Sequence, residues 1–218
     1  MAFLLAIEGA DGAGKATVSA AVVERLRAGG RRAEVVSFPR YAETAGGHVL
    51  GEYLAGRLPR SVSPQAAAVL YALDRFESRN HVAEVAGRCD VVVFDRYVAS
   101  NMAYQSAQVP HANAEALMEW IAALELSQFA LPAPDLCVYL DTPQDVALAL
   151  IARKRRRSYT EEAYDAYEAD ATLQARVREN YAAMAAEGLL GRWATVATTV
   201  GGESRAPEEI AGEIVGLL

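Results

Sequence analysis

Short apolar runs alternate along the chain with longer segments whose apolar positions recur at helical spacing. The run DVVVF at Asp90–Phe94 is almost continuously hydrophobic, which is typical of a strand buried on both faces. Such alternation predicts a parallel sheet covered by helices on both sides. The five predicted strands are Phe3–Ile7, Ala33–Phe38, Asp90–Phe94, Leu136–Leu140 and Trp193–Ala197.

Glycine, proline and small polar residues mark the ends of the predicted helices. The first helix begins in a glycine-rich loop and ends at Ala28–Gly30, where glycine can adopt the left-handed C-cap conformation. Asn113 and Thr142 are the predicted N-caps of two later helices. The other predicted helical segments are Glu43–Gly56, Pro64–Ala86, Asn113–Ala130, Thr142 to the basic run Arg153–Arg157, Glu161–Glu187 and Pro207–Leu218.

Length and composition favour one α/β domain. The chain has 218 residues, of which 52% are hydrophobic, and neither a repeat nor a linker divides it. A formal net charge of -7 argues against a general nucleic-acid binder. The apolar runs are too short to span a bilayer, and the first residues lack the basic start of a signal peptide. We therefore expect a cytoplasmic protein without nucleic-acid or membrane partners, whose Cys137 is a reduced structural thiol.

The stretch GADGAGK after the first predicted strand has the spacing of a phosphate-binding loop. Its glycines let consecutive backbone N–H groups turn towards an anion, and the following helix adds its positive N-terminal end. Lys15 is expected to reach the outer phosphates of a nucleotide. The residues predicted to bind that nucleotide are Gly9, Ala10, Asp11, Gly12, Ala13, Gly14, Lys15, Ala16 and Thr17.

This loop lacks the hydroxyl that normally follows the lysine and ligates magnesium, because Ala16 occupies that position. Thr17 lies about 100° further around the helix and is not expected to replace it. Magnesium keeps several waters and uses substrate phosphates, so nearby carboxylates can compensate for one lost ligand. Our hypothesis is that Asp11, Asp95 and Glu168 hold the metal, partly through water; the alternative for Asp95 is an ordinary loop cap.

Four further motifs follow the loop in order: SFPRY at Ser37–Tyr41, ALDR at Ala72–Arg75, FDRYVASNMAY at Phe94–Tyr104 and YEAD at Tyr167–Asp170. With their spacing, they closely resemble thymidylate kinases, especially the actinobacterial branch of that family. The resemblance covers nearly the whole chain. It implies a P-loop kinase fold with a five-stranded parallel sheet and a mobile lid. It also implies phosphorylation of dTMP to dTDP with ATP and Mg²⁺, and a homodimer.

The resemblance also assigns roles to residues. Arg96 resembles the arginine that grips the acceptor phosphate, and a planar guanidinium can bond two of its oxygens at once. Phe38 resembles the ring that stacks on thymine, with Pro39 fixing the turn, although a phenylalanine after a strand is otherwise typical of a core. The other substrate-binding residues that it implies are Tyr41, Tyr71, Arg75, Ser100, Asn101, Tyr104, Asp165 and Tyr167.

Among these residues, Arg75 resembles the donor to thymine O4, and Asn101 resembles the residue that bonds the edge of the ring. A donor facing O4 would meet an amino group if cytosine entered, so such a site can discriminate strongly. The alternative for Arg75 is an ion pair with a neighbour on its helix. Neither Asp74 nor Glu77 lies three or four positions away, and Arg79, four positions on, has the same charge.

The basic run RKRRR at Arg153–Arg157 is compatible with a solvated helix end or with a contact to RNA or acidic lipid. In the family that the chain resembles, this segment is the lid, here about residues 152–164. Gly12 stands where some members carry a catalytic arginine. We therefore expect the lid to supply that charge, from Arg153 or Arg157.

Several other functions stay open at this point. A deoxynucleoside kinase would require a carboxylate base after the second strand, where FPRY stands instead. A regulatory GTPase would require the guanine-reading NKxD motif, which the sequence lacks. A nucleic-acid binder acting through the lid, and a catalytically dead relative that lost magnesium with the hydroxyl at position 16, are the remaining alternatives.

Overall fold

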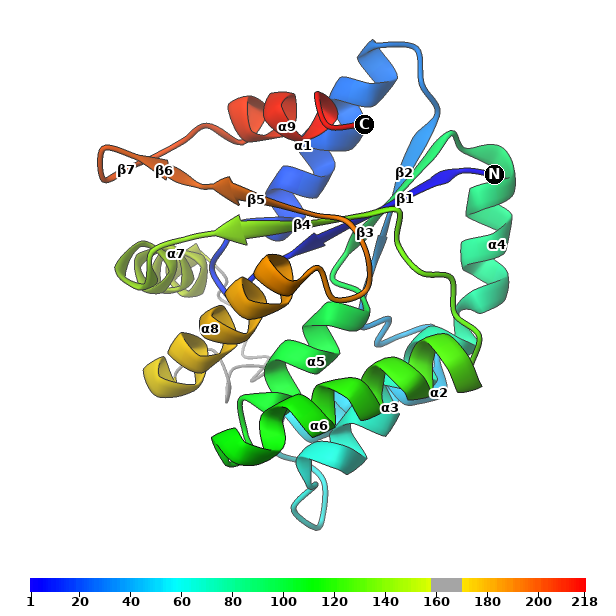
Figure 1. The fold of residues 1–218 in the computed structure, drawn as a ribbon, viewed down its shortest axis with the longest axis vertical. Helices are drawn as coiled ribbons and strands as arrows, with labels where there is room; N and C mark the ends of the chain where they lie inside the picture. Colours follow the sequence, from blue (N-terminus) through cyan, green and yellow to red (C-terminus); the bar gives the residue numbers. More distant parts are fainter. Residues whose placement is uncertain (158–169) are drawn as a thin grey trace.

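A five-stranded, all-parallel sheet forms the centre of the chain (Figure 1). The computed structural model describes residues 1–157 and 170–218, and for residues 153–157 the backbone alone. The sheet order is β2-β3-β1-β4-β5. The strands are β1 (Phe3–Glu8), β2 (Ala33–Ser37), β3 (Val91–Asp95), β4 (Leu136–Asp141) and β5 (Trp193–Ala197), and each agrees with its prediction within one residue.

Helices cover both faces of this sheet, as the alternation of apolar runs predicts (Figure 1). On one face lie α1 (Lys15–Ala28) and α9 (Pro207–Val215). On the other lie α4 (Arg79–Arg88), α5 (Val98–Ser106) and α8 (Ala171–Glu187), with α6 (His111–Ala122) packed on α5. The remaining elements are α2 (Ala45–Leu54), α3 (Pro64–Glu77), the π-helix η1 (Ala123–Gln128), α7 (Gln144–Arg157) and a hairpin of β6 (Thr199–Val200) and β7 (Glu203–Ser204).

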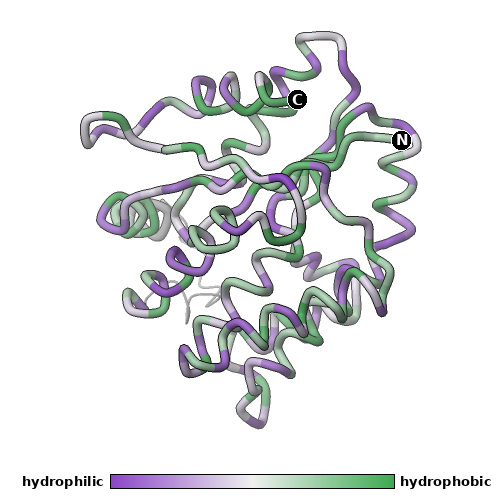
Figure 2. The backbone as a smooth tube through the Cα atoms, in the orientation of Figure 1, coloured by the Kyte–Doolittle hydropathy of each residue, from purple (hydrophilic) through white to green (hydrophobic). Residues whose placement is uncertain are grey.

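The two halves of the core follow from strand geometry, because successive side chains point to opposite faces. In β1, Leu5 and Ile7 pack with α1 and α9, whereas Ala6 packs with the layer that contains α5 and α8. All three side chains are fully buried. Figure 2 shows the hydrophobic residues concentrated along the central strands, with hydrophilic residues on the outer helices and loops.

Three predicted helix boundaries are wrong. The segment Pro64–Ala86 forms two helices that meet at Ser78, whose hydroxyl bonds back to the carbonyl of Asp74 at 2.8 Å and so competes with the helix ladder. Helix α6 begins at His111, and the Asn113 N–H already bonds Pro110 O at 2.8 Å, so Asn113 lies inside the first turn.

The third wrong boundary is at α8, where the carboxylate of Asp170 accepts the N–H groups of Thr172 and Leu173, both at 3.0 Å. Asp170 is therefore an N-cap, and the predicted helix Glu161–Glu187 cannot run continuously through it. Residues 161–169 of that prediction lie outside the described residues. The sequence analysis also missed α5, which follows β3.

The carboxyl ends of β1, β2 and β3 meet at one edge of the sheet, where Asp95 is in register with Ile7 and with Ser37. The loop after β1, the Phe38–Pro39 turn and the segment beginning at Arg96 all start there. Chain connections diverge on either side of β1, which is where open parallel sheets bind ligands. The predicted site residues that directly follow β1, β2 and β3 are therefore brought to one edge by topology.

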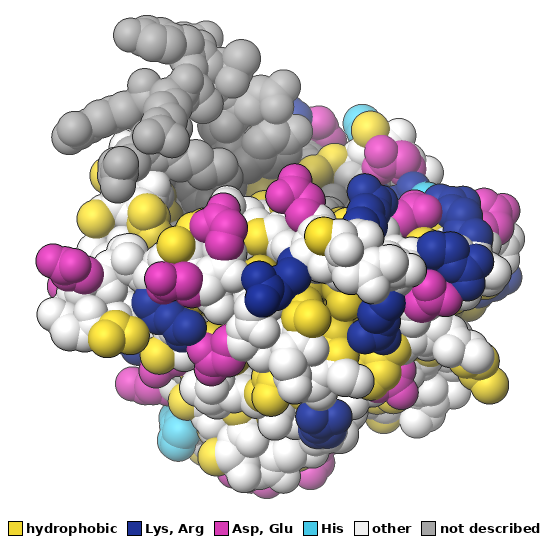
Figure 3. Space-filling model, turned by 90° about the horizontal axis from the view of Figure 1, so that it is seen from above, with side chains coloured by type: hydrophobic (Ala, Val, Ile, Leu, Met, Phe, Trp, Pro, Cys, Tyr) yellow, Lys and Arg dark blue, Asp and Glu magenta, His cyan; other side chains and the backbone are white. Residues whose placement is uncertain are grey.

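The described residues contain no helix that is both long and apolar enough to cross a bilayer. On the face shown in Figure 3, Lys and Arg side chains lie among Asp and Glu side chains instead of forming a stripe of one sign. Three exposed arginines of the described residues are paired with carboxylates, as Arg32–Asp90, Arg57–Glu52 and Arg88–Glu34. Cys89 and Cys137 are both buried free thiols.

Candidate functional site

The glycine-rich loop turns sharply between β1 and α1. Gly12 and Gly14 have φ angles of 80° and 79°, a left-handed conformation that side chains rarely adopt. Gly12 also lies against α7: a Cβ built on it would overlap the backbone carbonyl of Ala147. The loop therefore requires glycine at position 12 for both its backbone conformation and its packing.

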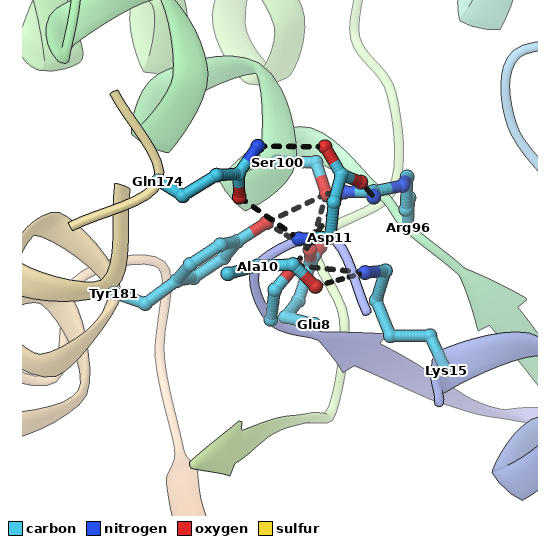
Figure 4. Close-up of polar contacts among 9 residues, drawn as sticks. Glu8, Ala10, Asp11, Lys15, Arg96, Ser100, Gln174 and Tyr181 are labelled. Atoms are coloured by element: carbon cyan, nitrogen blue, oxygen red, sulfur yellow. Dashed lines mark hydrogen bonds and ion pairs between the residues drawn. The ribbon is translucent and has the colours of Figure 1, made fainter. Parts of the chain in front are cut away.

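Lys15, the first residue of α1, folds back onto this loop. Its ammonium group donates to the carbonyl oxygens of Gly9 at 2.9 Å and Ala10 at 2.7 Å, and the side chain is buried (Figure 4). Burial lowers the pKa of Lys15 to about 7, and the nearby charge of Arg96 acts in the same direction, while Asp11, Asp95 and Glu8 oppose it. The loop thus holds an amine whose charged form anionic phosphates would stabilise.

A pH dependence of stability follows from this buried lysine. Between pH 7 and its ordinary value of 10.5, the unfolded chain binds a proton at Lys15 that the folded chain has largely lost. The free energy of unfolding contributed by this group therefore rises with pH across that window. Urea unfolding at several pH values from 7 to 10 should show the wild type gaining stability relative to Lys15→Met. If the difference in free energy of unfolding between the two proteins did not change with pH, Lys15 would not have a lowered pKa in the folded chain.

Asp11 forms an ion pair with Arg96 across the mouth of the loop. Gln174 of α8 holds the same residue twice: its amide nitrogen donates to the Asp11 carboxylate at 3.0 Å, and its oxygen accepts the Asp11 N–H at 3.1 Å (Figure 4). Burial acts to raise the pKa of Asp11, but Arg96 and Lys15 outweigh it and leave that pKa below its ordinary value. Asp11 is therefore held as a carboxylate.

Arg96 is positioned by its backbone and by its neighbours. It has a φ of 66°, and its guanidinium lies over the ring of Tyr104 at 5.1 Å from the centroid. Its Nη1 also contacts the Ser100 hydroxyl at 3.4 Å and the Gly9 carbonyl at 3.5 Å. Lys15 at the start of α1 and Arg96 after β3 thus converge on the same carbonyl oxygen.

Beneath these residues lies Glu8, which the sequence analysis missed. It is fully buried and accepts from the Tyr97 N–H at 2.8 Å, the Ser100 hydroxyl at 2.6 Å and the Tyr181 hydroxyl at 3.0 Å. Burial raises the pKa of Glu8 despite these bonds. Glu8 therefore fixes the segment that carries Arg96 to the end of β1. The sequence does carry a signal for this residue, because Glu8 is an acidic side chain at the end of a buried apolar strand.

A second cluster lies beside Phe38. The Phe38 ring is buried against Phe94 and Tyr97, with centroids 6.2 and 6.0 Å away, and the Arg75 guanidinium lies 5.9 Å from its centroid. Phe38 is thus a core ring, as a phenylalanine after a strand usually is. It also lies next to Arg75, which is predicted to read the base. Phe38 and Pro39 are joined by a cis peptide bond.

Arg75 has an ion-pair partner that the sequence analysis did not find. Its Nε and Nη2 donate to the two carboxylate oxygens of Glu125 in η1, at 2.5 and 2.6 Å, and both side chains are buried. Helix spacing relates Arg75 only to neighbours on its own helix, and Glu125 lies 50 positions away. Asn101 joins this pair by donating to Glu125 at 2.8 Å.

The other predicted site residues have varied environments. Pro39 and Tyr41 line an open groove of about 410 Å³, which His81 also borders, and Tyr71 is half-buried on α3. Ala16 and Thr17 are exposed on the first turn of α1. The predicted residues Asp165, Tyr167 and Glu168, and most of the predicted lid, lie outside the described residues, as do the side chains of Arg153 and Arg157.

The donors present fit a magnesium ion that takes most of its ligands from phosphate and water. Asp11 and Asp95 offer carboxylate oxygens close enough to Lys15 to act on its pKa. Within residues 1–157 and 170–218, no group of three His, Cys, Asp or Glu could hold an ion without further ligands. Because Mg²⁺ is usually bound through one or two carboxylates and substrate phosphates, this sparse set is the expected kind.

Comparison with known proteins identifies clear relatives. A family model described as thymidylate kinase matches residues 7–201. The thymidylate kinase of Mycobacterium tuberculosis is 38% identical over 200 residues, covering 90% of this chain and 92% of that protein. The human thymidylate kinase is 30% identical over 162 residues, covering 74% and 68%. A solved structure of thymidylate kinase from Candida albicans has a TM-score of 0.71 at 21% identity, covers 99% of this chain and 90% of that one, and supports the predicted fold.

Proposed function

Since the chain belongs to the thymidylate kinase family, we propose that it phosphorylates dTMP at the carboxyl edge of the sheet and that Lys15, Arg96 and Asp11 carry the transfer. It is an ATP-dependent nucleoside monophosphate kinase of dTTP biosynthesis: the γ-phosphoryl group of ATP moves to the phosphate of dTMP, and the products are ADP and dTDP.

One observation supports this assignment most directly. The side chains of Lys15 and Arg96 share the Gly9 carbonyl oxygen as an acceptor, at 2.9 and 3.5 Å. That oxygen carries only a partial negative charge, so phosphate oxygens would be better acceptors for both cations. We infer that the two cations turn to the two nucleotides when these bind, with Lys15 on ATP and Arg96 on the phosphate of dTMP.

The proposed mechanism relies on position and charge. The acceptor is already an anion, so in-line transfer requires no strong general base. The amides of residues 9–15 and Lys15 would hold the donor phosphates, while Arg96 would align the acceptor. Bound Mg²⁺ would neutralise charge on the phosphates, with Asp11 and Asp95 as its protein ligands and Glu168 as the proposed third. Arg153 or Arg157 would supply the remaining positive charge.

The loss of the hydroxyl at position 16 leads to a prediction about magnesium. Asp11→Asn should raise the Mg²⁺ concentration for half-maximal activity about tenfold or more, because it removes a charged ligand. Ala16→Ser should lower that concentration only slightly. The exposed first turn of α1 has room for the added hydroxyl, so the variant should fold normally. Activity titrated with Mg²⁺ at fixed ATP measures both. Small effects of similar size in the two variants would contradict Asp11 as the replacement ligand.

We also propose that the enzyme is a cytoplasmic homodimer. Trp120 on α6 and Val69 on α3 are each 40% exposed, which gives these neighbouring helices apolar surface for a second subunit. Two free thiols are the form expected in a reducing compartment. Light scattering during size-exclusion chromatography measures the oligomeric state, and a monomer at micromolar concentration would contradict the dimer.

The proposed function is tested by ADP release across a panel of acceptors. We expect rapid ADP release with dTMP, slower release with dUMP and dCMP, and little with thymidine, which lacks the acceptor phosphate. Thymidine as the best acceptor would instead identify a deoxynucleoside kinase. No ADP release with any acceptor at saturating Mg²⁺ would identify a catalytically dead relative.

A further inference from the structure

The buried carboxylate of Glu125 binds two of the proposed base-reading residues at once. Oε1 accepts from Arg75 Nη2 at 2.6 Å and from Asn101 Nδ2 at 2.8 Å, while Oε2 accepts from Arg75 Nε at 2.5 Å. The exposed fractions of the side chains of Arg75 and Glu125 are 2% and 0%. All three contacts are donors, so Glu125 has to be an acceptor on both oxygens, as a carboxylate is.

These contacts determine which way the Asn101 amide faces. Its nitrogen donates to Glu125 and also to the Ala68 carbonyl at 3.0 Å, and neither partner can donate in return. An amide turned by 180° would place its oxygen against two acceptors. The Asn101 oxygen therefore has to face the other way, and it is buried without a hydrogen-bond partner among the described residues. A buried acceptor of this kind is costly unless a ligand satisfies it.

The Glu125 carboxylate also determines which N–H donors of Arg75 stay available to a ligand. Glu125 takes Nε and Nη2, so Nη1 is the guanidinium nitrogen outside the pair. The cluster thus retains the Nη1 group of Arg75 as a donor and the oxygen of Asn101 as an acceptor. Thymine presents the complement, because its O4 accepts and its N3–H donates. Cytosine presents the reverse, with a donating amino group and an accepting N3.

We propose that Glu125 is the residue that makes this site select thymine over cytosine, by holding Arg75 as a donor and Asn101 as an acceptor. It is a positioning residue: it acts through these two side chains and is not assigned a contact with the substrate. The inference rests on the proposed function, because it concerns the acceptor nucleotide of that reaction.

The local backbone explains how Glu125 reaches this place. It lies in the π-helix η1, where the Phe129 N–H bonds Leu124 O, five positions back, at 2.9 Å. A π turn contains one residue more than an α turn, and such insertions are frequent at functional sites. Here the widened turn leads directly from α6 and carries Glu125 to Arg75 on α3 and Asn101 on α5.

Glu125→Gln tests the proposal, because glutamine keeps the size of the side chain but adds a donor. The amide offers one oxygen and one NH₂ in place of two carboxylate oxygens. It therefore cannot accept all three donors of Arg75 and Asn101, and the orientation of these two side chains is no longer fixed. We expect the ratio of kcat/KM for dTMP to that for dCMP to fall about tenfold or more, the value of one satisfied hydrogen bond. KM for dTMP should rise while KM for ATP stays unchanged.

A modified substrate sharpens the test. dTMP methylated at N3 has no donor for the Asn101 oxygen, so the wild type should use it poorly compared with dTMP. In Glu125→Gln this penalty should shrink, because the Asn101 oxygen is no longer held towards N3. A general loss of structure would lower activity on both nucleotides and leave their ratio unchanged.

Two further variants complete the design. Glu34→Gln makes the same chemical change in the exposed Arg88–Glu34 pair and should leave both ratios unchanged. Glu125→Asp keeps the charge beside Arg75, but its side chain is too short to bind both Arg75 and Asn101. The dTMP-to-dCMP ratio should therefore fall in this variant too, which keeps the proposal testable if Glu125→Gln does not fold. Wild-type ratios in the folded Glu125 variants would overturn the proposal, whereas a wild type inactive on dTMP would instead overturn the proposed function.

Discussion

Replacing Arg96 by methionine should lower kcat/KM for dTMP by about 10²–10³-fold, with the chain still folded. Arg96 lies between the Asp11 carboxylate, the Tyr104 ring and the Gly9 carbonyl, so a phosphate placed there would meet an oriented guanidinium. Methionine keeps much of the length of the side chain. It adds no new backbone strain either, because both residues have a Cβ at a φ of 66°.

Two comparisons make this prediction specific. Arg96→Lys restores the positive charge but not the planar fork, so it should recover only part of the lost activity. Arg88→Met removes an arginine from an exposed pair with Glu34, a kind of pair that contributes little to stability, and should not change kcat/KM. Steady-state kinetics with dTMP varied at saturating ATP measures all three variants. A loss below tenfold in Arg96→Met would rule out this arginine as the residue that binds the acceptor phosphate.

Gly12→Ala should produce the largest loss of stability among single substitutions in the phosphate loop, about 3 kcal/mol. A left-handed φ disfavours alanine by about 1–2 kcal/mol, and forcing the methyl group into packed structure adds about 1–3 kcal/mol. The added atom meets the Ala147 carbonyl, which belongs to the backbone of α7 and cannot rotate away. Urea unfolding without nucleotide measures the change.

The chain provides a matched control at Gly30. Its φ of 81° equals that of Gly12 within a degree, but a Cβ built there meets nothing within 4 Å among the described residues. Gly30→Ala should therefore lose only the backbone part, about 1 kcal/mol. Equal losses in the two variants would show that contact with α7 does not restrict position 12.

Local sequence patterns predicted the sheet and the glycine-rich turn after β1 well, because both depend on neighbours in sequence. The apolar runs set the strand bounds, and GADGAGK set the turn in which Lys15 now lies. The order of parallel strands then brought Asp95 and Arg96 to that loop, as strand ends in such sheets do.

The contacts between distant segments were not predictable in this way. Glu8 bonds Tyr181, which lies 173 positions further along the chain, and Gln174 bonds Asp11 across 163 positions. No periodicity or cap signal links residues so far apart. The buried Arg75–Glu125 pair was missed for the same reason, since helix spacing says nothing about a partner on another element. The boundary at Ser78 was missed because a hydroxyl that competes with its own helix has no strong sequence signal.

The close approach of Gly12 to Ala147 has an evolutionary consequence. Any side chain at position 12 would displace α7, the same helix whose last turn carries the basic run at Arg153–Arg157. A lineage that places an arginine at position 12 of the loop has to reposition that helix as well. An arginine in the loop thus requires coupled changes in α7, and a single substitution at position 12 does not supply them.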